Sequence, residues 1–327
     1  MNDKECQKQV AETGRILLEK KLVARTWGNI SARVLGMKFA ISPSGLGYEH
    51  MTEEDVPVYD DETGAFTGTR KPSSEKLVHA AAYRIYPEVR FVIHTHQDYA
   101  TAVGLVGTKE LELHPEEKEV LGKIEVASYG LPGTKKLGAN VEAALKTGAK
   151  IILMKHHGAL ILGSDRDDAI AKAELLETVC KRAVLGKIGE PDRESSEAID
   201  AAIVRATPNM KVHATPDLLY MAEAGGFKAQ LDDMAQMLGS RIRAVKNDPD
   251  LILGALQKQD AVLVRNVGCV TLTEKADDGD ALMLLMEKAA TAKRYSEAFG
   301  VQADLSAFDC ALMRTVYKMK YSKKKEG

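Results

Sequence analysis

Three histidines and one glutamate are the side chains of this sequence best suited to chemistry. The 327-residue chain contains eight histidines, and three of them, His94, His96 and His157, stand at the ends of apolar segments. Zinc in proteins is commonly bound by imidazole nitrogens, and a catalytic zinc site uses about three protein ligands. Glu75 adds a carboxylate that can ligate the ion or move a proton. Together these residues predict a catalytic zinc centre.

Two predicted elements would hold the first part of this site. Residues 91–96 form a β-branched apolar run that ends in a His-x-His pair, and side chains two apart on a strand point to the same face. His94 and His96 can therefore reach one ion. Glu75 lies in the first turn of a predicted helix over 72–86, where serines suit the cap. Complementing the helix dipole is the simpler alternative role for this carboxylate.

A predicted hairpin would hold the third histidine. The apolar run 151–154 is followed by His156 and His157, a turn at Gly158 and a second apolar run, 159–162. Adjacent side chains on extended backbone face opposite ways, so spacing alone leaves open which of the two histidines binds the ion.

The composition excludes several classes of protein. Lys and Arg number 45 and Asp and Glu 47, so the net charge of −2 gives no electrostatic case for nucleic acid or an anionic membrane surface. No segment reaches the roughly 20 apolar residues of a membrane helix, and the polar start is no signal peptide. Four scattered cysteines fit a reducing compartment. We expect a cytoplasmic protein with a full hydrophobic core.

Glycine and proline residues mark the turns and boundaries between the other predicted elements. Turns are expected at 27–31 and 42–45, and the segment 108–135 carries weak signals. A linker rich in glycine, proline and charge is predicted at 186–196. The remaining predicted elements are a strand at 39–41 and helices at 4–21, 100–105, 136–146 and 167–186.

The C-terminal part repeats the pattern of the predicted hairpin. Residues 150–158 align without gaps with 260–268 at a constant offset of 110, and the match continues into the following helix. Val267 stands where the first copy has His157. Valine offers no atom that binds a metal, so the second copy keeps the packing pattern and loses the chemistry.

A shorter match lies upstream. With a small shift in offset, residues 212–217 can be laid on 93–98, which aligns Thr215 with His96. We therefore predict two domains: residues 1–190, which carry the metal ligands, and 191–327, a degenerate partial repeat without them.

Five ordered motifs carry a family resemblance. They are Gly28-Asn29, Ser42-Pro43-Ser44-Gly45, Pro72-Ser73-Ser74-Glu75, His94-Thr95-His96 and His156-His157-Gly158. In order and spacing this set resembles the class II aldolase/adducin family, over about residues 5–188. The resemblance implies an α/β fold with a three-layer α/β/α arrangement around a central, mostly antiparallel sheet. It also implies a homo-oligomer, usually a tetramer, with active sites at subunit boundaries.

The resemblance implies a role for each matching residue. His94, His96 and His157 would bind one zinc ion per chain, with Co²⁺ or Mn²⁺ as other candidate metals, and Glu75 would be the fourth ligand or the catalytic base. His156 would be a hydrogen-bonding neighbour. Serine hydroxyls and backbone N–H groups at a helix N-terminus can hold a phosphate without lysine or arginine. The residues implied for that phosphate are Gly28, Asn29, Ser44, Gly45, Ser73 and Ser74.

The expected activity is that of a metal-dependent lyase. Zinc would stabilise an enediolate while Glu75 moves the proton, which for a phosphorylated ketose gives retro-aldol cleavage. One departure concerns the proton donor: the family aldolase has a tyrosine after the His-x-His strand, whereas Gly107–Val126 contains none, and His114 is the nearest donor by position.

Other activities of the family stay open. A dehydratase or a decarboxylase of a sugar phosphate would need the same enediolate. An epimerase usually has aspartate at the position of Glu75. A non-enzymatic, adducin-like scaffold is the alternative from another class, and the three retained histidines argue against it.

Overall fold

The chain folds into two compact units, Met1–Ala183 and Val184–Gly327. The structure is a computed structural model that describes residues 2–109, 111–189, 197–199, 204 and 207–325. Most of the predicted linker, 190–196, lies outside the described residues, and residues 186–188 form the end of a long helix instead.

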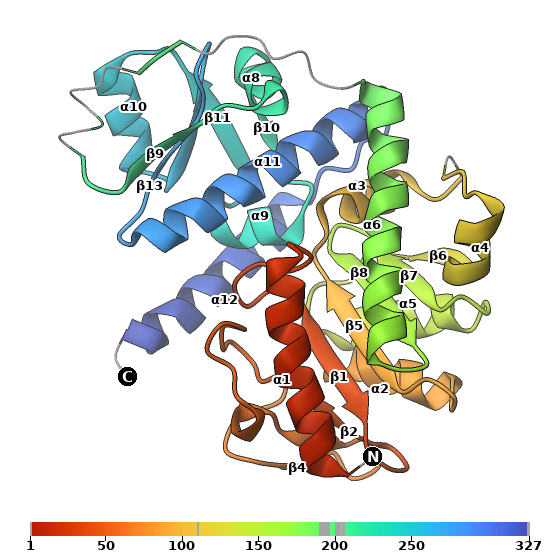
Figure 1. The fold of residues 1–327 in the computed structure, drawn as a ribbon. Coiled ribbons are helices and arrows are strands. Elements are labelled where there is room, and N and C mark those ends of the chain that lie inside the picture. The colour runs from red at the N-terminus through yellow and green to blue at the C-terminus, as the bar shows by residue number, and fades with distance from the viewer. Residues whose placement is uncertain (1, 110, 190–196, 200–203, 205–206, 326–327) are drawn as a thin grey trace. The chain divides into compact units, whose positions relative to one another are not determined.

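The first unit is built around one eight-stranded sheet (Figure 1). Its strand order is β4-β3-β2-β1-β5-β8-β7-β6, and every pairing is antiparallel except that of β6 with β7. The strands are β1 (Asn29–Arg33), β2 (Lys38–Ile41), β3 (Val58–Asp60), β4 (Phe66–Thr67), β5 (Phe91–Thr95), β6 (Ile124–Ala127), β7 (Ile151–Met154) and β8 (Gly158–Gly163).

Helices cover both faces of this sheet. They are α1 (Asp3–Glu19), α2 (Lys76–Ile85), α3 (Asp98–Val106), α4 (Pro115–Leu121), α5 (Lys135–Leu145) and α6 (Arg166–Ile188), with a 3-10 turn at Glu53–Asp55. The apolar faces of α2 and α5 share a core with Val92 and Ile152, whereas Gly104 of α3 packs on Leu153, which points to the opposite face. Figure 1 shows α1 and α6 on the side of α3. The predicted α/β fold, with a mostly antiparallel sheet between helical layers, is confirmed.

The turn predicted at 27–31 is wrong in its second half, which belongs to the central strand β1. This strand lies between β2 and β5, and all five of its residues are buried. Polar side chains at Asn29, Ser31 and Arg33 hid it from a pattern that looks for apolar residues. These side chains face α2, where hydrogen bonds compensate their burial.

Two further elements lie in the segment with weak signals. Helix α4 begins at Pro115 after the N-cap residue His114, and Glu117 accepts a hydrogen bond from the His114 backbone N–H in a capping box. Strand β6 follows at the sheet edge.

Helix α2 begins at Lys76 rather than at Pro72, so Glu75 is its cap residue and lies outside the first turn.

The second unit has its own five-stranded sheet, with strand order β10-β11-β12-β13-β9. Its strands are β9 (Met210–His213), β10 (Gly226–Lys228), β11 (Arg241–Val245), β12 (Ala261–Val264) and β13 (Gly268–Leu272). Its helices are α8 (Pro216–Glu223), α9 (Asp232–Met237), α10 (Pro249–Leu256), α11 (Ala276–Ala298) and α12 (Ala307–Lys325).

Part of the second unit has the element order of the first. The pairings β11–β12 (parallel), β12–β13 and β13–β9 (both antiparallel) match β6–β7, β7–β8 and β8–β5. The structural register corrects the upstream sequence alignment by one residue. His213 pairs with Cys269 as Thr95 pairs with Ala159, so Ala214, not Thr215, stands at the position of His96. Thr215 corresponds instead to Gln97, since each caps the helix that follows.

Within the part of the chain that the structure describes, no helix combines the length and the apolar character needed to cross a bilayer.

Candidate metal centre and active site

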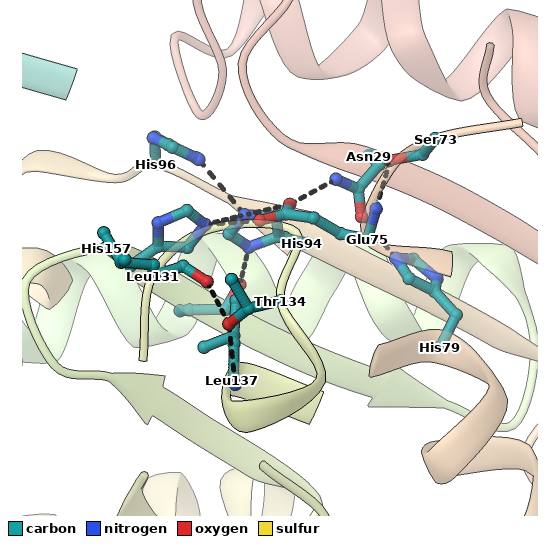
Figure 2. Close-up of polar contacts among 11 residues, drawn as sticks. Asn29, Ser73, Glu75, His79, His94, His96, Leu131, Thr134, Leu137 and His157 are labelled. Atoms are coloured by element: carbon teal, nitrogen blue, oxygen red, sulfur yellow. Dashed lines mark hydrogen bonds and ion pairs between the residues drawn. The ribbon is translucent and has the colours of Figure 1, made fainter. Parts of the chain in front are cut away.

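Three imidazoles converge on one point beside the end of strand β5 (Figure 2). His94 belongs to β5, His96 follows that strand, and His157 comes from the connection between β7 and β8. The Nε2 atom of His94 lies 3.1 Å from Nε2 of His157 and 3.1 Å from Nε2 of His96. His94 and His157 are buried, while His96 is half-buried.

The protonation of His94 follows from its backbone contact. Its Nδ1 lies 2.9 Å from the carbonyl oxygen of Ala159, which can only accept, so Nδ1 carries the hydrogen. Burial lowers the pKa of His94 well below its ordinary value, and the ring is neutral. Its Nε2 lone pair therefore faces the two other Nε2 atoms.

This arrangement fits a divalent cation. Four ligands at the zinc–nitrogen distance of about 2.0–2.1 Å in a tetrahedron lie roughly 3.3 Å from one another. The separations of 3.1 Å around His94 are close to that value. The hydrogen bond that holds His94 by its other nitrogen is also typical of metal-binding histidines.

Glu75 completes the cluster from the cap of α2. Its Oε1 lies 3.0 Å from His157 Nε2, and its Oε2 lies 3.4 Å from His94 Nε2. Asn29 Nδ2 donates to Oε2 at 2.8 Å. Burial raises the pKa of Glu75, but the charge and hydrogen bond of His157 and the hydrogen bond from Asn29 outweigh it and hold the pKa well below its ordinary value. The carboxylate is thus ionised and directed at the histidines rather than at the helix dipole.

The structure distinguishes the two adjacent histidines. His157 Nε2 points to His94, whereas the ring of His156 packs edge-on against Tyr129 at a centroid distance of 5.0 Å. His156 has a positive φ of 69°, which turns the chain between β7 and β8. Gly158 begins β8 rather than forming the turn, and a Cβ there would meet the carbonyl oxygen of Thr95.

Gly28 and Trp27 form one wall of the centre. Gly28 has φ of 81°, and a Cβ at this position would lie 2.4 Å from the carbonyl oxygen of His94. The absence of a side chain lets the loop approach the strand that carries two of the histidines. The ring of Trp27, the only tryptophan of the chain, is stacked near that of His96 at a centroid distance of 6.3 Å.

The serine loops implied for phosphate binding are neighbours. Ser44 N donates to Lys71 O at 2.9 Å and Ser73 N donates to Ser42 O at 3.1 Å, around a bridge between Pro43 and Pro72. Ser73 Oγ accepts a hydrogen bond from Glu75 N at 3.2 Å, so this loop leads directly into the carboxylate.

A third loop, which contains Gly133 and Thr134, lies next to the two serine loops. Gly133 packs against Ser74, and Thr134 Oγ1 donates to Leu131 O at 2.6 Å, beside the histidines in Figure 2. Gly45 has the positive φ of 76° that its turn requires. Asn29 differs from the rest of the phosphate set because both ends of its amide are engaged, with Glu75 and with His79.

His114, named as the nearest proton donor by position, is an exposed residue at the cap of α4.

Three contributors to this site are not among the residues that the sequence motifs indicate. His79 lies one helical turn after Glu75, and the spacing Glu-x-x-x-His was a signal that could have revealed it. Trp27 precedes the Gly28-Asn29 motif. The Ala159 carbonyl is a backbone group, so residue type could not indicate its contact with His94.

Comparisons with known proteins agree with this architecture. The sequence profile of the "Class II Aldolase and Adducin N-terminal domain" matches residues 8–184. The "L-fuculose phosphate aldolase" of Methanocaldococcus jannaschii is 34% identical over 180 residues, which cover 55% of this chain and 96% of the relative. The "3-oxo-tetronate 4-phosphate decarboxylase" of Haemophilus influenzae is 29% identical over 186 residues, covering 55% and 88%.

A solved structure described as "L-fuculose 1-phosphate aldolase" is also similar. It has a TM-score of 0.52 and 30% sequence identity, with 57% of this chain and 89% of that chain covered. With more than half of its length matched by the family profile and the family's fold around its histidine cluster, the chain belongs to the class II aldolase and adducin family.

Proposed function

We propose that the first unit is a zinc-dependent lyase that cleaves a C–C bond of a phosphorylated ketose. The observation that carries this proposal is the ionised Glu75 carboxylate, 10% exposed and 3.0 Å from His157 Nε2 at the edge of a three-histidine cluster. A carboxylate in this place can exchange a proton with a substrate bound at the metal centre. The relatives named as fuculose phosphate aldolases supply the substrate class.

His94, His96 and His157 would hold the ion. Zinc in this place would act as a Lewis acid for the negative charge that develops on the substrate oxygens. Glu75 removes a proton from the carbon beside the substrate carbonyl in the condensation direction and returns it in the cleavage direction. Because Asn29 occupies Oε2, the oxygen that faces His157, Oε1, is the one that takes the proton.

The serine loops would bind the substrate phosphate. Ser44, Ser73 and Ser74 offer hydroxyls, with Gly45 beside them, on segments that are hydrogen-bonded to one another and lead into Glu75. Binding at these loops would place the sugar carbons next to the carboxylate. Gly28 supports the site through its close approach to His94, and Asn29 through its hydrogen bond to Glu75.

A panel assay tests the activity. Phosphorylated four- to six-carbon ketoses and sugar acids are incubated with the Zn²⁺, Co²⁺ or Mn²⁺ protein, and release of aldehyde is measured. We expect Glu75→Gln to reduce turnover by about 10²–10⁴-fold, since a general base contributes that much, while the zinc content is retained. Glu62→Gln, at an exposed position of the same unit, should leave turnover unchanged. Near-normal activity of the Glu75 variant would refute the proposed base.

A sugar-acid phosphate decarboxylase is the second candidate. It is favoured by the Haemophilus influenzae relative and by the lack of tyrosine in the segment Gly107–Val126. Release of CO₂ from a sugar acid, without aldehyde release from any ketose, would select it over the lyase.

For the second unit we propose a degenerate partial repeat without a metal centre. Its strand pairings correspond to those of the first unit, and Val212, Ala214 and Val267 stand where the first unit has His94, His96 and His157. One zinc per chain, unchanged in His213→Ala, is the expected result, and a second equivalent of zinc would contradict it. Assembly is the role we assign to this unit, within a homo-oligomer that light scattering would detect.

A further inference from the structure

A ladder of polar side chains joins β1 to α2 directly behind the carboxylate. Every second residue of the strand faces every fourth residue of the helix. Two residues of a strand span about 6.6–6.8 Å and four residues of a helix about 6.0 Å, so the two rows stay in register over several steps. The facing pairs are Asn29 with Glu75 and His79, Ser31 with His79 and Tyr83, and Arg33 with Tyr83.

The contacts of this ladder are short and buried. His79 Nε2 lies 2.5 Å from Asn29 Oδ1, and His79 Nδ1 lies 2.6 Å from Ser31 Oγ. Ser31 Oγ lies 2.8 Å from the Tyr83 hydroxyl. His79 and Ser31 have no exposed surface, and Asn29 and Tyr83 have 4% and 1%.

The direction of each hydrogen bond is determined from the carboxylate outward. Asn29 donates its Nδ2 hydrogen to Glu75 Oε2 at 2.8 Å and therefore presents its Oδ1 to His79. That oxygen only accepts, so His79 Nε2 must carry a hydrogen. Burial lowers the pKa of His79 to about 3, which keeps the ring neutral and leaves Nδ1 without a hydrogen.

The remaining two bonds follow. Ser31 must donate its hydroxyl hydrogen to His79 Nδ1, and Tyr83 must donate to Ser31 Oγ. Burial raises the pKa of Tyr83, so its hydroxyl keeps the hydrogen that this direction requires. Donation thus runs one way, from Tyr83 through Ser31, His79 and Asn29 to Glu75 Oε2.

We propose that His79 is a positioning residue that fixes which oxygen of Glu75 is free to act on the substrate. With the opposite tautomer, His79 Nε2 would present a lone pair, and the Asn29 amide would turn its oxygen toward Glu75 Oε2. Two acceptors would then face each other, and the carboxylate would rotate away from the histidines. The proposal rests on the proposed function in one respect, the role of Glu75 as the base.

Two substitutions separate positioning from packing. His79→Leu removes the donor to Asn29, whereas His79→Gln places an amide nitrogen near the site of Nε2 and keeps it. Because a hydrogen bond to a charged group contributes about 1.5–3 kcal/mol, we expect kcat to fall about 10- to 100-fold in His79→Leu, with little change in KM. His79→Gln should recover most of the loss.

Tyr86→Phe serves as a control for hydrogen bonds that stabilise α2 but do not reach Glu75. Tyr86, the C-cap residue of α2, donates to Leu145 O and Ala149 O, outside the ladder, so Tyr86→Phe removes hydrogen bonds at the end of the same helix without touching Glu75. It should leave kcat unchanged. In a Glu75→Gln background, His79→Leu should cause no further loss of kcat, because His79 acts only through Glu75. An equal loss in both backgrounds would overturn the proposal.

Crystal structures of the metal-free variants give a readout that needs no substrate. We expect the Glu75 carboxylate to be rotated in His79→Leu and in its native orientation in His79→Gln, with Ser31→Ala intermediate. An unchanged carboxylate in His79→Leu would overturn the positioning role. If the native protein turned over no compound of the panel, the proposed function would fail, while these structures would still decide the role of His79.

Discussion

Glu75 Oε1 lies 3.0 Å from His157 Nε2, although the two residues are 82 positions apart and belong to different elements. Glu75 caps α2, and His157 lies in the short connection between β7 and β8. The contact depends on the left-handed backbone of His156, which turns the chain so that His157 and not its neighbour faces the carboxylate. In the second unit Asn266 has the same left-handed backbone and precedes Val267.

The adjacent histidines therefore offer a matched test of the metal centre. His157→Asn should abolish binding of one equivalent of zinc, measured by elemental analysis after dialysis. His156→Asn should leave the zinc content near one per chain, because asparagine tolerates a positive φ and stands at the corresponding place in the second unit. Equal zinc content in the two variants would refute the assignment of His157.

Removal of the metal should destabilise the protein measurably. A ligand at 100 times its Kd stabilises the native state by about 2.7 kcal/mol, which for a unit of this size raises the Tm by roughly 5–10 °C. Differential scanning calorimetry with and without a chelator measures the shift. His157→Asn serves as the control, since its Tm should not respond to the chelator.

Trp27 should report the same binding event by fluorescence. Its ring is stacked near His96 at 6.3 Å, and no other tryptophan contributes to the emission of the chain. Co²⁺ quenches a nearby indole efficiently, so a titration should quench the emission and reach its end point at one equivalent. The quenching should be absent in His157→Asn. Quenching that persists there would show that cobalt binds near Trp27 without the histidine centre.

The elements that could be predicted most accurately from the sequence are those with long runs of apolar residues. Strands β5, β7 and β8 and helix α6 are visible in this way, because both faces of the strands and one stripe of the helix are buried. The central strand β1 was missed because its inward side chains are polar. Their burial is offset by partners on α2, which are distant in sequence and which no local pattern can identify.

Some features of the site could also be predicted from local sequence patterns, whereas others depend on tertiary structure. Residue types and order were sufficient to predict the histidine cluster, since the His-x-His spacing on a strand is a local property. Spacing alone left His156 and His157 equivalent; the family resemblance implied His157, and the backbone of the turn agrees with it. The position of Glu75 needed the exact residue at which α2 begins. The one-residue error in aligning Thr215 with His96 has a similar origin, because strand register is set by pairing across the sheet.

Gly28 should tolerate substitution less well than Gly36. Both have positive φ, but a Cβ at Gly36 would meet nothing within 4 Å, whereas one at Gly28 would lie 2.4 Å from the His94 carbonyl oxygen. Gly36→Ala should cost about 1–2 kcal/mol of unfolding free energy from backbone strain alone. Gly28→Ala should cost roughly 2–5 kcal/mol, since the clash is added. It should also weaken zinc binding by displacing His94. Equal losses in urea unfolding would contradict this account.

His79 should make the stability of the metal-free first unit depend on pH. Its pKa falls from about 6.5 in the unfolded chain to about 3 in the native state because of burial. The unfolded chain therefore binds a proton between these values and the native state does not, so stability is lost as the pH falls below 6.5. Each pH unit in this window lowers the free energy of unfolding by about 1.4 kcal/mol.

The variant His79→Gln has no titrating group at this position. The difference in unfolding free energy between the native sequence and this variant should therefore shrink by about 1.4 kcal/mol per pH unit. Urea unfolding followed by Trp27 emission at pH 7, 6 and 5 measures this difference. A difference that stays constant would mean that His79 is protonated in the folded protein, which is incompatible with the hydrogen-bond directions of the ladder.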